Sequence, residues 1–294
     1  MVRTRHHRSF GVAIAAVGLV VIAGLGGCTP PPDTYVALGD SYTAGPLIPN
    51  QSLSPLGCLR SDKNYPSVAR TQVRATKFKD VSCSGATTDD FYEPQGVTPG
   101  PPNAPQLDAL NNMTKIVTIG IGGNDVGFSD IVKNCALQNP FGQGCQAEYT
   151  PGDRDLLRER IAVVAPKVRR VLSDARARAP RAQVFIVGYP TVLPEVGNGC
   201  YPLVPILPVD VPYLRGFTKA LNSMIAAEAQ ATGAHYIDIY TPSINHDVCQ
   251  IPTEKWVEGI FPTSLLAAPV HPNGTGMRAT AGFVAARINQ VVTS

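Results

Sequence analysis

The sequence predicts a three-layer α/β/α fold around a central, mainly parallel five-stranded sheet. Short apolar runs typical of buried strands alternate with longer amphipathic stretches that have helical spacing. Strands that alternate with helices form parallel βαβ units, and helices cover both faces of the resulting sheet. The 294 residues show no internal repeat and no second domain boundary, so we expect one large domain.

The first three strands are predicted in the N-terminal half. The apolar run Tyr35–Leu38 is the first, and a Pro-rich loop and a short amphipathic helix from Tyr65 to Ala75 follow it. The second strand covers Phe78 to Cys83. Residues 91–106 are rich in Pro and Gly and predict a loop. The apolar run Ile116–Ile121 is the third strand.

The C-terminal half continues the alternation. Residues 153–179 carry apolar side chains near helical spacing, with arginines on the other face. Gln183–Val187 is the fourth strand, Val211–Ala231 a further helix and His235–Tyr240 the fifth strand. The last helix is predicted to open at Pro272-Asn273.

Residues 1–27 have the pattern of a lipoprotein-type signal peptide. Arginines precede an uncharged apolar run that ends in Leu-Gly-Gly before Cys28, which resembles a bacterial lipobox. We expect lipidation of Cys28, with residues 28–33 as a short stiff tether to a domain over residues 34–294. A retained anchor stays open because the apolar run approaches spanning length. Plain secretion stays open as well, because the small residues before the cleavage point do not separate it from lipidation. In each case the domain works outside the cytosol.

The charge balance argues against a nucleic-acid partner. Arg3, Arg5 and Arg8 account for the formal net charge of +3, and no basic run of the kind that tracks phosphates follows them. The only membrane contact that we expect is through the Cys28 lipid anchor, and we expect a monomer.

Six cysteines besides Cys28 indicate disulfide bonds. An even number in an exported chain is typical of disulfides, although six cysteines allow fifteen pairings. Cys135 and Cys145 bracket a short loop, so their mutual pairing is favoured by proximity. No Cys/His spacing suggests zinc, and no sequence feature implies a metal or an organic cofactor.

The tetrapeptide Gly39-Asp40-Ser41-Tyr42 is the first candidate for chemistry. It closes the first strand, and Ser41 stands where a helix would begin, so its backbone N–H can face a developing negative charge. A turn in which Asp40 and Ser41 only cap the helix is the alternative interpretation. However, Gly85 and Asn124 also fall just past strand ends, where sites of open parallel sheets lie.

A serine nucleophile needs a base, and three histidines follow the signal segment. His235 lies inside a predicted strand, and His246 stands in a loop beside Asp247 and Cys249. His271 precedes the last helix, in a loop expected above the strand ends. His271 is therefore the favoured base.

These segments together resemble the SGNH (GDSL) hydrolase family, and more closely its secreted actinobacterial esterase and lipase branch with six cysteines. Gly39-Asp40-Ser41-Tyr42 resembles the nucleophile block, and Gly85 in Cys-Ser-Gly-Ala-Thr resembles the second block. Gly122–Asp125 is similar to the Gly-x-Asn-Asp block, and His271-Pro272 to the last. The four blocks occur in the family's order over nearly the whole mature chain.

The resemblance implies the SGNH-hydrolase fold, with Ser41 as nucleophile and His271 as general base and then acid. It implies an oxyanion hole formed by the backbone N–H groups of Ser41 and Gly85 and the side-chain amide of Asn124. It also implies three sequential disulfides: Cys58–Cys83, Cys135–Cys145 and Cys200–Cys249.

The chain departs from the family at the acid that usually stands three residues before the histidine. That position is Ala268. Some members of the branch orient the histidine with a backbone carbonyl, so we expect a Ser–His dyad aided by the carbonyl of Ala268 or one nearby. An acid supplied from elsewhere, such as Asp247, stays open. We expect Asp40 to order the nucleophile turn and Asp125 to support the Asn124 loop.

These features predict an exported carboxylester hydrolase, an esterase or lipase, acting on acyl esters or lipids. The stiff apolar stretch Tyr189–Pro212 is equally consistent with an acyl-chain wall and with a loop that covers the core. A second apolar loop carries Trp256, Phe261, Leu265 and Leu266. The alternatives are a carbohydrate O-deacetylase on the same fold and a catalytically silent lipoprotein that binds a lipid or glycan.

Overall fold

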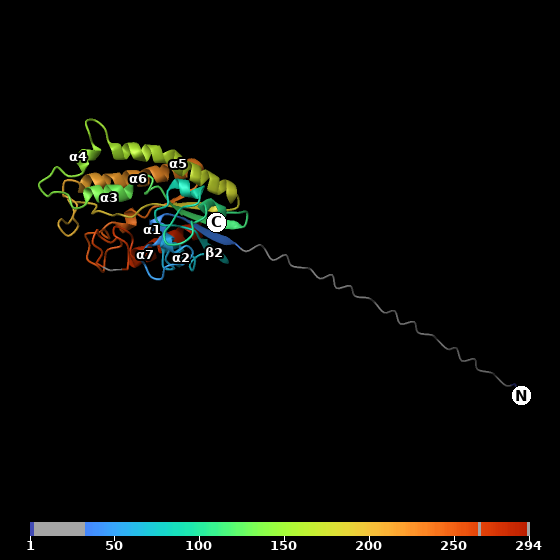
Figure 1. The fold of residues 1–294 in the computed structure, drawn as a ribbon. Coiled ribbons are helices and arrows are strands. Elements are labelled where there is room, and N and C mark those ends of the chain that lie inside the picture. The colour runs from blue at the N-terminus through green and yellow to red at the C-terminus, as the bar shows by residue number, and fades with distance from the viewer. Residues whose placement is uncertain (3–32, 264–265, 293–294) are drawn as a thin grey trace. The chain divides into compact units, whose positions relative to one another are not determined.

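The structure, a computed structural model, describes residues 1–2, 33–263 and 266–292, and residues 32–294 form one compact unit (Figure 1). Residues 3–27 of the predicted signal segment, Cys28 and Leu265 lie outside the described residues. Within the described part of the chain, no helix has both the length and the apolar character needed to cross a membrane.

Five parallel strands form one sheet in the order β2-β1-β3-β4-β5. The strands are β1 (Thr34–Gly39), β2 (Lys77–Asp80), β3 (Thr114–Gly120), β4 (Gln183–Val187) and β5 (His235–Ile237). Their apolar runs are continuous because both faces of the sheet are covered. In β1, Val36 and Leu38 pack into one core while Tyr35 and Ala37 pack into the other, as the alternation of a strand requires.

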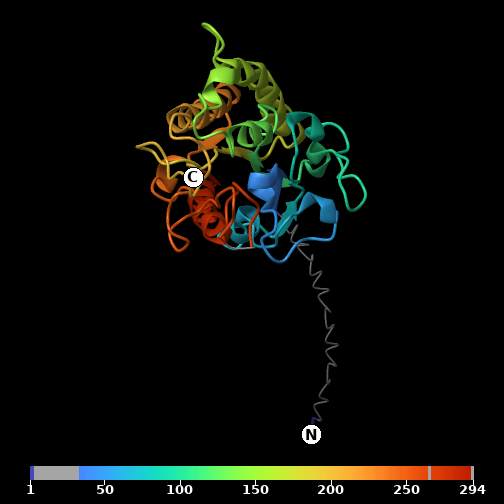
Figure 2. The ribbon, with the colours of Figure 1, turned by 60° about the vertical axis from the view of Figure 1, so that its left-hand side comes forward.

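Helices cover the sheet on both faces, as Figures 1 and 2 show. The pair α5 (Leu156–Arg178) and α6 (Val211–Thr232) packs on one face, and α2 (Tyr65–Ala69) and α7 (Gly274–Val292) pack on the other. This arrangement confirms the predicted three-layer α/β/α fold. The described residues also form shorter helical elements: α1 (Ser41–Ala44), α3 (Phe128–Cys135), α4 (Gln146–Tyr149) and the 3-10 turns Leu56–Cys58, Thr88–Phe91, Gln106–Ala109 and Thr241–Ser243.

Two predicted elements of the N-terminal half end early. The helix predicted to reach Ala75 stops at Ala69, just before the β-branched Thr71 and Val73, which are poor helix formers. The second strand ends at Asp80 rather than Cys83. The Asp80 carboxylate accepts the backbone N–H of Ser82, although the N–H groups of Val81 and Cys83 still donate to β1.

Two boundaries in the C-terminal half also differ from the prediction. The fifth strand ends at Ile237 instead of Tyr240, because the Asp238 carboxylate accepts the N–H of Thr241 and turns the chain. The last helix begins at Gly274. The Asn273 side chain caps it by accepting from the N–H groups at the second and third helical positions.

The order of the strands determines where a site can form. Between β1 and β3 the order reverses, and the chain leaves the carboxyl ends of these strands in opposite directions. Ligands of open parallel sheets bind at such a switch point. Ser41 follows β1 there, and Gly122–Asp125 follow β3.

Candidate active site

Ser41 is the first residue of α1, directly beyond the end of β1, and it is almost fully buried. The turn requires Gly39: φ is +151°, and a Cβ there would lie 2.3 Å from the Thr43 hydroxyl oxygen and 2.6 Å from the Gly120 carbonyl oxygen. Asp40 caps the turn by accepting the Tyr42 N–H at 2.8 Å. This contact agrees with the expectation that Asp40 orders the nucleophile turn.

The structure brings His271 to Ser41. The Nε2 atom of His271 lies 2.8 Å from the Ser41 hydroxyl oxygen, and Nδ1 lies 2.7 Å from the carbonyl oxygen of Pro269. A carbonyl only accepts, so Nδ1 carries the proton and Nε2 is free to accept the serine proton. We expected the carbonyl of Ala268 or one nearby, and the structure has the neighbouring Pro269 carbonyl in this position. The Ala268 carbonyl instead accepts the backbone N–H of His271 in a turn (3.2 Å).

Burial lowers the pKa of His271, because a charged imidazolium is poorly solvated there. The bond to the Pro269 carbonyl raises the pKa, but its effect is the smaller of the two. The balance favours the neutral imidazole that a general base requires.

A buried ion pair supports the loop that carries His271. Lys255 and Glu258 lie 2.9 Å apart, both almost fully buried. The Glu258 N–H donates to the His271 carbonyl oxygen at 2.9 Å, and the Glu258 carboxylate also accepts from the Asn273 amide. Glu258 therefore holds the chain at His271 through its N–H and at Asn273 through its carboxylate.

The second and third blocks also meet at this edge of the sheet. The Asn124 amide donates to the Ala86 carbonyl oxygen at 2.8 Å, and the Asp125 carboxylate accepts the Thr88 N–H at 3.1 Å. This is how Asp125 supports the Asn124 loop. Gly85 adopts φ of +81°. Within the described part of the chain, the Ser41 and Gly85 N–H groups donate to no other protein group.

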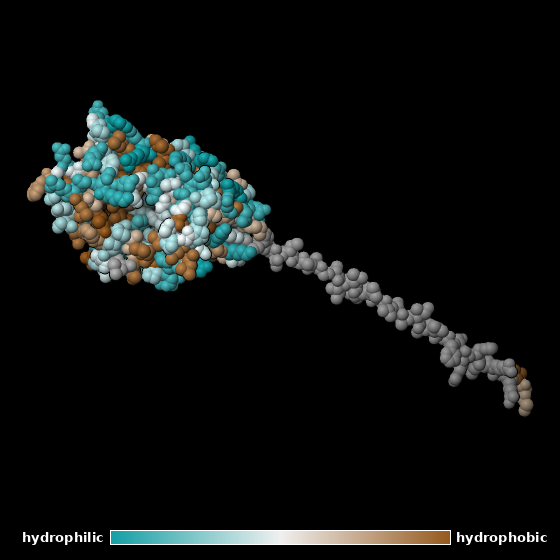
Figure 3. Space-filling model, viewed as in Figure 1, coloured by the Kyte–Doolittle hydropathy of each residue, from teal (hydrophilic) through white to brown (hydrophobic). Residues whose placement is uncertain are grey.

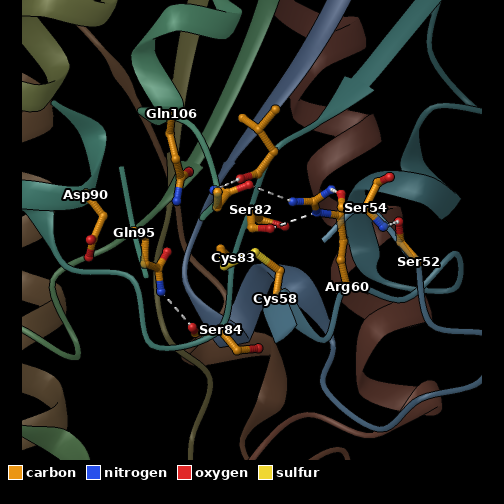
Figure 4. The surroundings of a disulfide bond; sticks show 12 residues. Ser52, Ser54, Cys58, Arg60, Ser82, Cys83, Ser84, Asp90, Gln95 and Gln106 are labelled. Carbon is orange, nitrogen blue, oxygen red and sulfur yellow. Dashed lines mark hydrogen bonds between the residues drawn. A yellow bond between two sulfur atoms is a disulfide. The ribbon is translucent and has the colours of Figure 1, made fainter. Parts of the chain in front are cut away.

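The loop before Gly85 is held by a disulfide and a buried glutamine (Figure 4). Cys83 is bonded to Cys58, and the Ser84 N–H donates to the Cys58 carbonyl oxygen at 3.0 Å. The Gln95 amide donates to the Ser84 carbonyl oxygen at 2.9 Å. The other bridges join Cys135 to Cys145 and Cys200 to Cys249, so the three pairs are those that the family resemblance implied.

Two residues that the sequence reasoning missed also hold the site. The Gln106 amide accepts the Gly39 N–H at 2.7 Å and donates to the Gly39 carbonyl oxygen at 3.0 Å. The Tyr189 hydroxyl donates to Asp40 at 2.6 Å and accepts the Gly123 N–H at 2.7 Å, which links the first and third blocks. Burial raises the pKa of Asp40 to about 7, against the lowering effect of these hydrogen bonds.

The alternative bases and the alternative acid lie elsewhere. His246 bonds to the Glu254 carbonyl oxygen and stacks on Trp256, and His235 bonds to Gln183. The Asp247 carboxylate accepts from the Cys249 N–H and the Gln250 amide. In the described ranges, no group of three or more His, Cys, Asp and Glu side chains is placed to hold a metal ion.

A narrow apolar cavity of about 40 Å³ adjoins the site. Val270, next to His271, and Phe128, which follows the third block, are among its lining residues. Four more lining residues come from the stretch Tyr189–Pro212, so this stretch forms part of the cavity wall. The lining residues are Phe128, Ile131, Val132, Cys135, Val192, Leu193, Val204, Ile206, Leu214, Phe217, Thr218, Val248, Ile260 and Val270.

Known proteins resemble this chain over the whole range that carries the site. A profile of the GDSL-like Lipase/Acylhydrolase family matches residues 37–279. Lipase 2 of Streptomyces coelicolor is 39% identical over 251 residues, which cover 83% of this chain and 82% of that protein. The crystal structure of phospholipase A1 from Streptomyces albidoflavus NA297 matches 87% of this chain and 98% of that chain, with 27% identity and a TM-score of 0.72. An extracellular lipase from Streptomyces rimosus matches the same shares with 27% identity and a TM-score of 0.71.

Proposed function

Because the chain belongs to the GDSL-like lipase/acylhydrolase family and is a carboxylic ester hydrolase, we propose that it cleaves acyl esters through a Ser41–His271 dyad and an acyl-enzyme. The contact of 2.8 Å between Ser41 Oγ and His271 Nε2 carries this proposal. This contact puts a proposed base within hydrogen-bond distance of the Ser41 hydroxyl, at the switch point of the sheet.

In the first half-reaction, Ser41 Oγ attacks the ester carbonyl carbon while its proton passes to His271 Nε2. The new C–O bond converts the carbonyl oxygen to an oxyanion, which the N–H groups of Ser41 and Gly85 and the Asn124 amide would stabilise. When the bond to the alkoxide breaks, His271 gives its proton to the leaving oxygen. The Pro269 carbonyl holds Nδ1–H throughout.

In the second half-reaction, water replaces the alcohol. His271 Nε2 takes a proton from the water as its oxygen attacks the acyl carbon, and the same proton returns to Ser41 Oγ when the acyl-enzyme bond breaks. The products are a carboxylic acid and the free enzyme. A neutral His271 is needed at the start of both half-reactions, which agrees with its lowered pKa.

The apolar cavity beside His271 supports an acyl-chain substrate. Almost all of its lining side chains are apolar, which suits an alkyl chain better than a sugar ring with its shell of hydroxyls. Exposed apolar side chains of Leu137, Leu203 and Phe261 lie close in sequence to lining residues. Figure 3 shows hydrophobic surface around α3 and the neighbouring loops. We therefore place the acyl chain of a lipid or similar ester in this cavity.

The protein is proposed to act outside the cytosol. Three disulfides favour an oxidising compartment. The Streptomyces rimosus relative is described as extracellular, which supports export of this chain as well. Lipidation at Cys28 would retain the enzyme at the cell surface, and cleavage without lipidation would release it.

Hydrolysis of p-nitrophenyl esters of graded chain length tests the activity. We expect hydrolysis of acyl esters longer than acetate, and kcat lower by at least about 10⁴-fold in Ser41→Ala and His271→Gln. The matched control is His246→Gln, which changes a histidine outside the site and is expected to keep wild-type kcat. Wild-type protein that hydrolyses none of the esters and resists a fluorophosphonate label at Ser41 would contradict the proposal. Activity on acetylated sugars alone would favour the O-deacetylase.

A further inference from the structure

One hydrogen bond joins the two chain segments that carry the proposed nucleophile and the proposed base. Tyr42 directly follows Ser41, and its hydroxyl donates to the carbonyl oxygen of Val270 at 2.6 Å. Val270 directly precedes His271. The bond therefore connects residues adjacent to both reacting side chains, although 228 positions separate Tyr42 from Val270.

Val270 adopts a backbone conformation that its side chain disfavours. Its φ of +58° lies in the left-handed region, which β-branched residues rarely occupy. Its N–H donates to the carbonyl oxygens of Glu258 (3.1 Å) and Gly259 (3.3 Å), while its own carbonyl accepts from Tyr42. Such strain persists only where the surroundings over-determine it, and here bonds hold both ends of the residue.

The orientation of His271 depends on this stretch of backbone. The carbonyl that fixes Nδ1 belongs to Pro269, on the other side of Val270. A change in the Val270 dihedral angles would therefore move the imidazole away from the Pro269 carbonyl that orients it. The Tyr42 ring also lies against the imidazole, with 5.1 Å between the ring centroids.

We propose that Tyr42 is a positioning residue that keeps His271 aligned with Ser41 by holding Val270 in its strained conformation. This inference rests on the proposed function. The direction of the hydroxyl is fixed, because the Tyr42 ring packs edge-on against Phe128 and Tyr189. Burial raises the pKa of Tyr42 above its ordinary value, so the hydroxyl stays a neutral donor at neutral and mildly alkaline pH.

The first test is Tyr42→Phe, which keeps the ring and removes only the hydroxyl. We expect kcat for a soluble ester to fall about 10- to 100-fold, as for other small misplacements of catalytic groups, with KM within about twofold. The rate of fluorophosphonate labelling at Ser41 should fall with kcat. The matched control is Tyr213→Phe, which removes a hydroxyl bonded to Asp155 at 2.9 Å and is expected to keep wild-type kcat.

The second test asks whether Tyr42 acts through Val270. Glycine adopts the left-handed region at little cost, so Val270→Gly removes the strain that Tyr42 is proposed to hold. In that background we expect Tyr42→Phe to lower kcat by less than about threefold, which a double-mutant cycle would detect. Thermal unfolding of each variant identifies a temperature at which all are folded, and kcat is compared there.

Several outcomes would overturn the inference and leave the proposed function intact. An unchanged kcat in folded Tyr42→Phe would do so, and so would a rise in KM at unchanged kcat, which would assign the hydroxyl to substrate binding. An equal loss of kcat in the wild-type and the Val270→Gly backgrounds would show that Tyr42 does not act through this strain. Failure of the proposed function has a different signature, namely wild-type kcat in Ser41→Ala or His271→Gln.

Discussion

His271 is oriented by a carbonyl oxygen, and this has consequences for its charge. The Pro269 oxygen carries only a partial negative charge, so it stabilises an imidazolium less than a carboxylate would. Burial acts in the same direction, because it disfavours the charged ring. His271 therefore stays neutral at lower pH than an ordinary histidine does, and in the proposed mechanism its protonated form would be a stronger acid toward the leaving group.

The pH dependence of kcat/KM tests whether His271 has a lowered pKa. The proposed mechanism requires neutral His271, so we expect activity to be lost as the pH falls through the pKa of His271. Because burial lowers this pKa, we expect the midpoint of the acid limb below 6.5, the usual value for histidine. A soluble ester assayed between about pH 4.5 and 8 provides the measurement.

Asp40 also lies near Ser41 and could titrate in this range, since its pKa is raised to about 7. The control is therefore Asp40→Asn, in which the midpoint should stay where it is in the wild type. A midpoint near 7 that disappears in Asp40→Asn would assign the acid limb to Asp40 and contradict the assignment to His271.

At the level of elements, the carboxyl end of β1 is fixed by a side chain from a distant loop. The Gln106 amide pairs with both the N–H and the carbonyl of Gly39, much as a neighbouring strand would, across 67 positions of sequence. Gln106 is fully buried, so no water is available to replace it without rearrangement. The turn that presents Ser41 begins at this glycine.

We expect Gln106→Ala to lower the free energy of unfolding by about 2–4 kcal/mol, because it leaves the Gly39 groups with fewer buried partners. Looser anchoring of the Ser41 turn should also lower kcat. Urea unfolding measures the first effect and ester hydrolysis the second. The matched control is Gln183→Ala at an exposed glutamine, where we expect a change within about 0.5 kcal/mol. Equal stability of the two variants would contradict the structural role of Gln106.

The sequence predicts the elements of this fold better than the contacts between its loops. The apolar runs of β1, β3 and β4 identify strands because both faces of the sheet are buried, and their ends locate Ser41 and Asn124. Gln106 and Tyr189 give no comparable signal. Gln106 reaches Gly39 through the path of a long loop, and Tyr189, just beyond β4, reaches residues that follow β1 and β3. No local pattern encodes either contact. Which carbonyl bonds to Nδ1 of His271, that of Pro269 or that of Ala268, also depends on a turn that no local pattern encodes.

At the level of the whole molecule, the cross-links lie where regular structure is scarce. Each of the six bonded cysteines belongs to a connection that leaves the carboxyl end of a strand, at the edge of the sheet that carries the site. At the opposite edge, α2, α5 and α6 lead into β2, β4 and β5. The disulfides therefore constrain loops that hold the site residues, beyond the ends of the regular strands.

Reduction should cost the protein most of its stability. The bridges close loops with sequence separations of 25, 10 and 49 residues. From loop-closure entropy, the three bridges are expected to stabilise the folded state by about 3.5, 3 and 4 kcal/mol, and together by about 10 kcal/mol. Folded domains are stable by only about 5–15 kcal/mol in total. We therefore expect a chain unfolded in urea with a reductant, then diluted with the reductant kept, to recover neither near-ultraviolet circular dichroism nor esterase activity.

The control for this refolding experiment is the same cycle of urea and dilution without reductant, after which both signals should return. The difference between refolding with and without reductant measures the effect of the disulfide bonds, because the sequence and its apolar side chains are the same in both. Recovery of native-like signals by the reduced chain would mean that the sheet and its two helical layers alone hold the site loops in place. In that case the disulfides would contribute less than loop-closure entropy assigns them.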